Sequence, residues 1–200
     1  MIKWEPQRHP LIFAFVAAIG TPFDPIFGSF AESLRRYDYS AEQIHLSQLL
    51  DRIKCAPWND LPDRSEYDYY QKRMDAGDKL RAEADSGSAM AAMGIVDIND
   101  DRSNSRRKST CAYFLRSLKH PDEVKLLRHI YGDSFFLIAI ASSYEERLHT
   151  LSESLSHFGE PRAEAERLID RDQNDDDDKV FGQNVRDTYA MADIFIPTNR

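Results

Sequence analysis

The stretch Leu11-Ile12-Phe13-Ala14-Phe15-Val16-Ala17-Ala18-Ile19-Gly20 decides the fold of this chain. Its apolar run is unbroken, rich in residues that favour β-structure and closed by a glycine, which is typical of a strand buried on both faces. Such a strand lies in the middle of a parallel sheet. A turn then leads to a helix, for which we expect Asp24 as the N-cap and Pro25 as the first helical residue.

The rest of the chain continues the alternation of strands and helices. Further strands are predicted over residues 39–47, 111–115, 135–141 and 193–196, and helices over 49–53, 65–84, 88–97, 121–130, 144–156 and 161–172. Polar runs predict loops over 56–64, 99–108 and 172–179, and residues 184–190 lead into the last strand. About five strands that alternate with helices indicate one α/β domain over 1–200, with three layers and a mainly parallel sheet.

The composition narrows the class of protein further. The chain of 200 residues is 42% hydrophobic and 30% charged, which suits a globular domain and excludes collagen-like and fully disordered chains. The longest apolar run has about nine residues against the ~20 of a membrane-spanning helix, and no secretory signal is predicted. Two cysteines without a CxxC pattern favour a reducing, cytoplasmic compartment. A net charge of −8 argues against affinity for duplex nucleic acid.

The turn after the first strand lies where parallel sheets bind phosphate. A glycine turn that leads into a helix offers backbone N–H groups to an anion, and Gly20 and Thr21 occupy this position. The P-loop pattern G-x-x-x-x-G-K-[ST] is absent, because no lysine or arginine occurs between Gly20 and Leu34. A nucleotide site and a merely structural β–α turn therefore remain as alternatives here.

Segments spread over nearly the whole chain resemble one protein family. Together they resemble the amino-terminal P-loop-kinase-like domain of the anti-phage deoxycytidylate deaminases, which is similar to deoxynucleoside-monophosphate kinases and precedes a zinc-dependent deaminase domain. The resemblance implies a P-loop NTPase-like fold. It also implies the binding of a deoxynucleotide or nucleoside triphosphate together with Mg²⁺. The segments that carry it are 15–21, 44–47, 116–124, 127–128, 131–136, 145–147, 168–172 and 181–188, of which the 116–136 block and the 182–192 region are the most specific.

The deaminase part of that family has no counterpart in this sequence. A zinc deaminase needs an H-x-E segment and a P-C-x-x-C segment. None of the six histidines is followed two residues later by glutamate, and Cys55 and Cys111 lie far apart. We therefore expect no zinc, no metal-binding residues and no deaminase domain here, so that a deaminase would be a partner protein or a domain outside this sequence. A further departure is Ala17, where family members often have glycine.

Positive charge for a phosphate must come from outside the turn. The resemblance implies Arg116 and Lys119, which follow the strand 111–115, and Arg147, which opens a helix where kinases of this fold carry lid arginines. The structural alternative is an ion pair of Arg116 with surface acids and of Arg147 with Glu145 or Glu146.

A second group of candidates precedes the last strand. Asn184, Arg186 and Asp187 could hold a base or ribose, and helix capping is the alternative. For Asp122 and Glu123, at the start of a helix, capping is favoured over metal binding.

Three functional hypotheses follow. The leading one is a nucleotide-binding, kinase-like regulatory or sensor domain of deoxynucleotide-depleting anti-phage defence. The second is an active deoxynucleoside-monophosphate kinase, which would need a phosphate-clamping cation and a Mg²⁺ site. The third is a structural assembly module with a vestigial pocket, which would form a homo-oligomer. No catalytic residue is assigned, and no duplex nucleic acid or membrane is expected as a partner.

Overall fold

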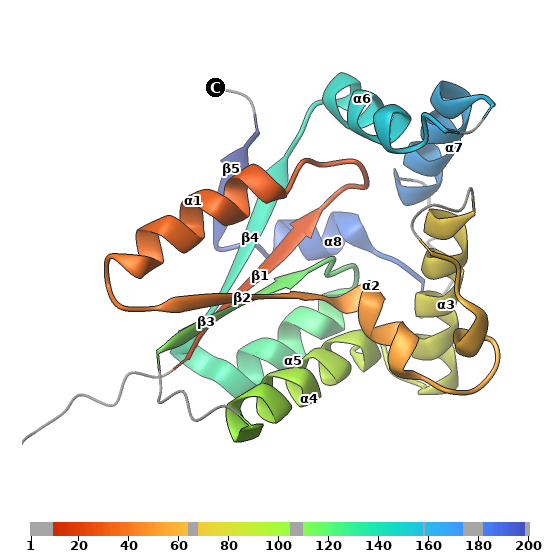
Figure 1. Cartoon of the computed structure of the whole chain (residues 1–200). Coiled ribbons are helices and arrows are strands. Elements are labelled where there is room, and N and C mark those ends of the chain that lie inside the picture. The colour runs from red at the N-terminus through yellow and green to blue at the C-terminus, as the bar shows by residue number, and fades with distance from the viewer. Residues whose placement is uncertain (1–9, 64–67, 105–109, 158, 174–181, 199–200) are drawn as a thin grey trace, which may run out of the picture.

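Five parallel strands form one sheet in the order β2-β3-β1-β4-β5 (Figure 1). The computed structural model describes residues 10–63, 68–104, 110–157, 159–173 and 182–198. Its strands are β1 (Leu11–Ala17), β2 (Ser40–His45), β3 (Cys111–Arg116), β4 (Phe135–Ala141) and β5 (Ile194–Pro197). The predicted parallel sheet of about five strands is confirmed, with the strand from Leu11 at its centre.

Helices cover both faces of the sheet, which completes the predicted three layers (Figure 1). The helix α1 packs on one face, whereas α4, α5 and α8 pack on the other. Helices α6 and α7 pack on each other. The helices are α1 (Asp24–Arg35), α2 (Leu46–Leu49), α3 (Tyr69–Glu83), α4 (Ala89–Asn104), α5 (Pro121–Tyr131), α6 (Tyr144–Ser154), α7 (Pro161–Gln173) and α8 (Val185–Ala190), with short 3₁₀ turns η1 (Leu50–Arg52), η2 (Trp58–Asp60) and η3 (Gly132–Ser134). None of the described helices is long and apolar enough to cross a membrane.

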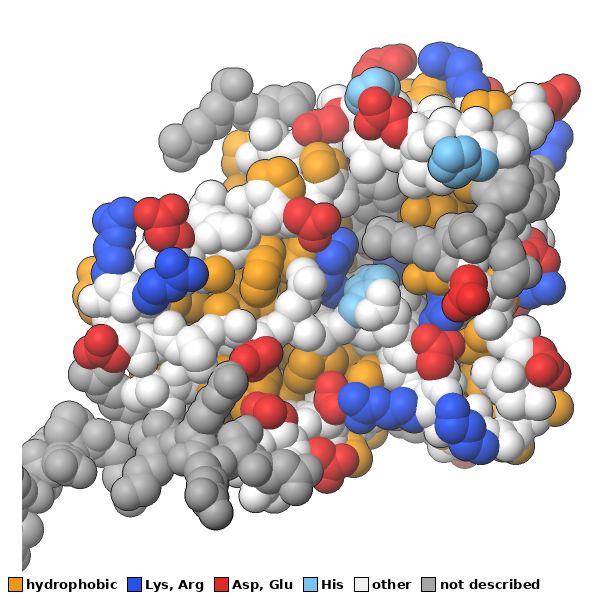
Figure 2. Space-filling view, viewed as in Figure 1, with side chains coloured by type: hydrophobic (Ala, Val, Ile, Leu, Met, Phe, Trp, Pro, Cys, Tyr) orange, Lys and Arg blue, Asp and Glu red, His pale blue; other side chains and the backbone are white. Residues whose placement is uncertain are grey.

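Alternate residues of β1 face the two layers of helices. Ile12 and Val16 are completely buried in the cluster that includes α4 and α5. Phe13 and Phe15 face the other side, where their rings lie 5.8 and 6.1 Å from the ring of Phe30 in α1. Helix α1 has no fully buried residue of its own, and hydrophobic side chains remain visible beside it (Figure 2). Both layers therefore need the unbroken apolar run of β1.

The start of α1 differs from the prediction. Its N-cap is Phe23, which makes no side-chain cap bond, and Asp24 is the first helical residue instead of the cap. Phe23 is buried, with its ring 4.8 Å from that of Phe15. The packing of this ring decides where the helix begins, and the carboxylate of Asp24 is left to accept a hydrogen bond from Arg116.

Helix α4 is longer than predicted. We expected a loop over residues 99–108, but the helix continues to Asn104, and residues 105–109 lie outside the described part of the chain. The buried hydroxyl of Tyr113 in β3 donates to Asp101 Oδ2 at 2.7 Å, which holds this last turn against the sheet. Burial raises the pKa of Tyr113, so the hydroxyl remains a donor. The predicted acidic loop over 172–179 also lies largely outside the described residues, although Asp172 is helical.

The turn after β1 depends on Gly20. This residue has φ +82, and a Cβ placed on it would lie 2.6 Å from the carbonyl oxygen of Arg147 and 2.9 Å from Cγ of Leu151. Both contacts belong to α6, one to its backbone and one to a side chain, so the turn packs directly on this helix. Only glycine combines the left-handed backbone with so close an approach.

We expect Gly20→Ala to destabilise the protein by about 1–3 kcal/mol, because the new methyl group meets backbone and the positive φ is strained. Gly28→Ala is the matched control, since no atom lies within 4 Å of the new Cβ in α1. That control should raise stability by about 0.4–1 kcal/mol. Urea unfolding of both variants measures the difference, and equal effects would contradict the role assigned to the turn.

Candidate functional site

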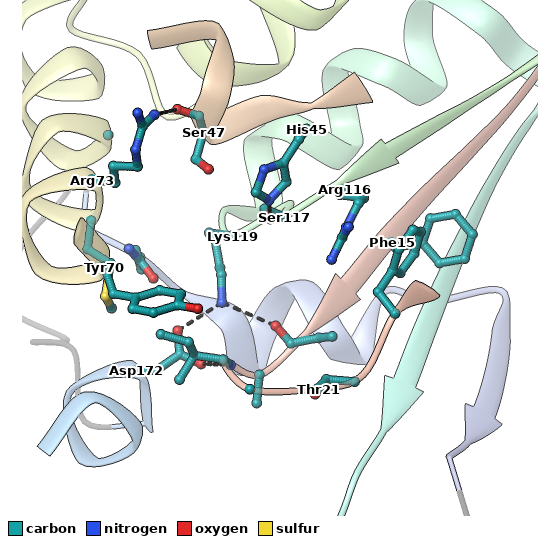
Figure 3. Close-up of a pocket in the computed structure, with 18 of the residues that line it drawn as sticks. Phe15, Thr21, His45, Ser47, Tyr70, Arg73, Arg116, Ser117, Lys119 and Asp172 are labelled. Carbon is teal, nitrogen blue, oxygen red and sulfur yellow. Dashed lines mark hydrogen bonds and ion pairs between the residues drawn. The ribbon is translucent and has the colours of Figure 1, made fainter. Parts of the chain in front are cut away.

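A cavity of about 260 Å³ opens at the carboxyl ends of β1, β2 and β3 (Figure 3). The neighbouring strands β1 and β3 lead into α1 and α5, which lie on opposite faces of the sheet. Ligands of open parallel sheets bind at such a switch point. The lining includes the turn over residues 17–21, the ends of β2 and β3, and side chains of α3, α6 and α7.

The cavity brings together half of the residues predicted from the sequence. Four of them line it, and four do not. Those that line it are Gly20, Thr21, Arg116 and Lys119; those outside its lining are Arg147, Asn184, Arg186 and Asp187.

Arg116 presents a cation to the cavity on an aromatic surface. Its Cζ atom lies 4.1 Å from the centre of the Phe23 ring, and Nη1 donates to Asp24 Oδ1 at 3.3 Å. The side chain of Asp24 is 87% exposed. Ion pairs of this exposed kind contribute about 0–1 kcal/mol, so an anionic ligand could replace the carboxylate at little cost. The surface-acid alternative for Arg116 is realised by its pair with Asp24.

Lys119 follows the end of β3, and its side chain reaches the turn after the neighbouring strand β1. Its Nζ donates to the carbonyl oxygen of Ala17 at 3.1 Å and to Asp172 Oδ1 at 2.8 Å. The second oxygen of that carboxylate accepts from the backbone N–H of Ile19 at 2.7 Å. A lysine from outside the turn therefore does supply positive charge there, but a buried carboxylate accompanies it.

Further polar groups come from the ends of β2 and β3. Nε2 of His45 lies 3.0 Å from Oγ of Ser117, a residue held at φ +71. Gln183, which is buried, also lines the cavity. Its Oε1 and the hydroxyl of Thr21 have no hydrogen-bond partner among the described residues. Buried polar atoms are normally paired, so these two are marked as atoms that a ligand could satisfy.

Helix α3 supplies a wall that the sequence did not predict. Tyr69 and Tyr70 line the cavity, and the hydroxyl of Tyr70 donates to Ser154 of α6 at 3.3 Å. Arg73 lies with Cζ 4.8 Å from the centre of the Tyr69 ring and donates to the carbonyl oxygen of Ser47 at 2.9 Å. No motif marks these residues in the sequence, because only the packing of α3 beside the sheet brings them to the site.

Arg147 is 5% exposed and lies beside the turn that it was predicted to serve. Its Nε and Nη1 have no hydrogen-bond partner among the described residues, so the predicted alternative of a pair with Glu145 or Glu146 is not formed. Glu146 instead accepts hydrogen bonds from Thr198 and Ser142, which lower its pKa. A buried arginine without an anion is costly. Its Cζ lies 5.9 Å from the centre of the Tyr144 ring, and only its backbone carbonyl oxygen is placed against Gly20.

The predicted group before the last strand caps a helix. Oδ1 of Asn184 accepts from the backbone N–H of Asp187 at 3.0 Å, and its Nδ2 donates to the carboxylate of Asp187 at 2.8 Å. Arg186 is exposed. The backbone N–H of Asn184 donates to the carbonyl oxygen of Lys119 at 2.7 Å, so the cap is tied to the site without lining it. The geometry favours the capping alternative for Asn184 and Asp187.

Glu123 fixes the segment that carries Lys119. Its carboxylate is completely buried and accepts from the backbone N–H groups of Lys119 at 2.7 Å and His120 at 3.1 Å. The other oxygen lies 3.4 Å from Nη2 of Arg81. Asp122 pairs with Lys125, whose hydrogen bond lowers the pKa of that carboxyl. The expected capping role of this acidic pair is confirmed for Glu123. Among the described residues, no three His, Cys, Asp or Glu side chains gather in a way that could hold a metal ion.

Comparison with known proteins gives similarity in structure only. No family model matches the chain, and no curated protein matches it. A protein from Silicibacter sp. TM1040, provisionally described as a fructose transport system kinase, aligns over 98% of this chain and 93% of its own, with 14% identity and a TM-score of 0.48. An uncharacterized protein from Eubacterium ventriosum ATCC 27560 aligns over 94% and 88%, with 10% identity and a TM-score of 0.42. Scores this low carry no functional inference.

We expect Glu123→Ala to cost about 3–5 kcal/mol of stability, because it leaves the buried Arg81 without this partner and removes the cap of α5. The matched control is Glu83→Ala, which removes a carboxylate from an exposed pair with Lys79. The control should change stability by less than about 0.5 kcal/mol. Denaturant unfolding of both variants checks this, and a small effect at Glu123 would show that the pair is not structural.

Proposed function

We propose that the cavity binds a deoxynucleotide and that the chain acts as a nucleotide-binding, kinase-like regulatory or sensor domain. One observation carries this proposal. Thr21 and Gln183 line the same cavity, and the hydroxyl of Thr21 and the side-chain carbonyl of Gln183 are buried and lack partners among the described residues. Such atoms cost stability unless a ligand satisfies them.

The other lining residues match the parts of a nucleotide. The rings of Tyr69 and Tyr70 offer an aromatic surface to a base on the α3 side. Arg116, at the end of β3, lines the cavity and offers a guanidinium to a phosphate. His45 and Ser117 add a hydrogen-bonding pair near the middle of the cavity for a sugar hydroxyl.

Binding is favoured over phosphoryl transfer. Transfer requires cations fixed on the phosphates and a Mg²⁺ ion held by acidic groups. The turn has no lysine of its own, and Lys119 is paired with Asp172. Mg²⁺ would therefore enter with the nucleotide as its counterion. An active deoxynucleoside-monophosphate kinase remains the alternative function, and turnover of ATP with a deoxynucleoside monophosphate would establish it.

The biological setting of this proposal rests on the resemblance of residues 116–136 and 182–192 to the anti-phage deoxycytidylate deaminases. In that setting nucleotide occupancy would report the deoxynucleotide pool to a deaminase, present as another domain or as a partner protein. Assembly into a homo-oligomer would let several pockets act together. The structural-module alternative predicts assembly without any nucleotide binding.

Arg116→Ala should weaken deoxynucleotide binding about ten- to a hundredfold, since a charge-assisted hydrogen bond contributes roughly 1.5–3 kcal/mol. Calorimetric titration with deoxynucleoside mono- and triphosphates at fixed salt and Mg²⁺ measures the affinity. Arg36→Ala, which removes a cation from the exposed pair with Glu32 in α1, is the control and should change nothing. No binding to the parent chain at millimolar ligand would overturn the proposed function.

Arg147→Met should separate stability from binding. Arg147 is buried and has no ion-pair partner among the described residues. Replacing such a charge by an apolar side chain of similar volume should leave stability unchanged or raise it by about 1–4 kcal/mol. If Arg147 serves a phosphate, as the resemblance implies, the loss of its charge should weaken nucleotide binding several-fold, up to about tenfold. Arg162→Met, at an exposed pair on α7, controls for net charge. Reduced stability with unchanged affinity would assign Arg147 to the fold alone.

A further inference from the structure

A carboxylate of this chain occupies the anion position of the turn after β1. Asp172 lies in the last turn of α7, and its side chain is 1% exposed. One oxygen accepts from the backbone N–H of Ile19 at 2.7 Å, and the other accepts from Nζ of Lys119 at 2.8 Å (Figure 3). The carboxylate therefore bridges the turn and the segment after β3.

These two donors are the kind that phosphate uses in parallel α/β domains. A backbone N–H at the end of a central strand and a lysine ammonium together bind a phosphate oxygen through charge-assisted hydrogen bonds. Here both are satisfied by Asp172. A second anion at these donors is opposed by Asp172, because two negative charges at such a distance repel strongly in a buried site.

We infer that Asp172 is an intramolecular competitor for phosphate, so that a phosphorylated ligand contacts Lys119 and the turn only when this carboxylate leaves. The inference rests on the proposed function and describes the regulation of that same site. Uncharged parts of a ligand are not opposed in this way. Thr21, Gln183 and the tyrosines of α3 line the cavity while Asp172 is in place, so the carboxylate selects against the phosphate and not against the nucleoside.

The position of Asp172 is maintained by the contacts of α7. Leu168 and Ile169 pack in a cluster with Leu148 and Leu151 of α6. Arg171, the preceding residue, pairs with Asp75 of α3 at 2.5 Å. A shift of the last turn of α7 would break the pair between Arg171 and Asp75. The same shift would withdraw the carboxylate of Asp172 from the turn after β1. On this inference, the contact of α7 with α3 influences how strongly the turn after β1 binds an anion.

The test compares a deoxynucleoside with its monophosphate in the parent chain and in Asp172→Asn. The variant keeps the size of the side chain and an acceptor for Ile19 but removes the negative charge. Affinity for the monophosphate should rise about tenfold or more, while affinity for the nucleoside should change by less than about twofold. Asp170→Asn is the matched control, since it removes the same charge from an exposed position of the same helix; it should raise monophosphate affinity much less.

The outcomes separate this inference from the proposed function. If the parent binds the monophosphate and Asp172→Asn binds it equally or more weakly, Asp172 is a structural tether and the inference fails alone. If the variant gains affinity for inorganic phosphate but neither chain binds nucleoside or nucleotide better than phosphate, the inference stands and the nucleotide proposal fails. If neither chain binds any of these ligands, both fail.

A measurement on the parent chain covers the case in which the variant does not fold. Hydrogen exchange of the last turn of α7 should become faster at saturating monophosphate, because the ligand displaces Asp172, and should not change with the nucleoside. Unchanged or slower exchange with the monophosphate would overturn the inference. Binding of the nucleoside in the same experiment reports on the proposed function independently.

Discussion

The burial of β1 on both faces is the constraint on which the rest of the structure depends. A strand whose side chains alternate between two apolar layers can occupy only the middle of the sheet, and its end must then lie between two neighbouring strands. The turn at Gly20 is thereby placed among the ends of β2 and β3 and against α6. The cavity follows from this placement, because the helices that could fill it belong to opposite faces.

Most of the cations around the cavity are paired with carboxylates. Lys119 is paired with Asp172, Arg73 with Asp51, and Arg81 with Asp78 and Glu123. The buried members of these pairs have lost their hydration, so each is held by its partner more firmly than an exposed pair would be. Arg116 differs, since its carboxylate partner is exposed. The site is thus rich in cations and yet offers little unpaired charge.

The sequence predicted local structure well and contacts across the fold poorly. The apolar runs of β1, β3 and β4 were sufficient to place their strands, and the acidic start of α5 was sufficient to predict capping. The N-cap of α1 was predicted at Asp24, because the buried ring of Phe23 has no signature in the sequence. Asp172 was assigned to the edge of an acidic loop, since its partner Ile19 lies 153 residues away. Tyr70 was missed for the same reason: only tertiary packing brings it to the cavity.

The strand order has a consequence for how the chain is made. Leu11 of β1 pairs with Ala112 of β3, and Ile12 pairs with Phe135 of β4. During synthesis, about a hundred further residues must therefore be added after β1 before β3, its first neighbour, has been made. An unpaired hydrophobic strand of this kind is prone to associate with other chains. The same burial that organises the finished domain leaves this strand prone to association until β3 and β4 have been made.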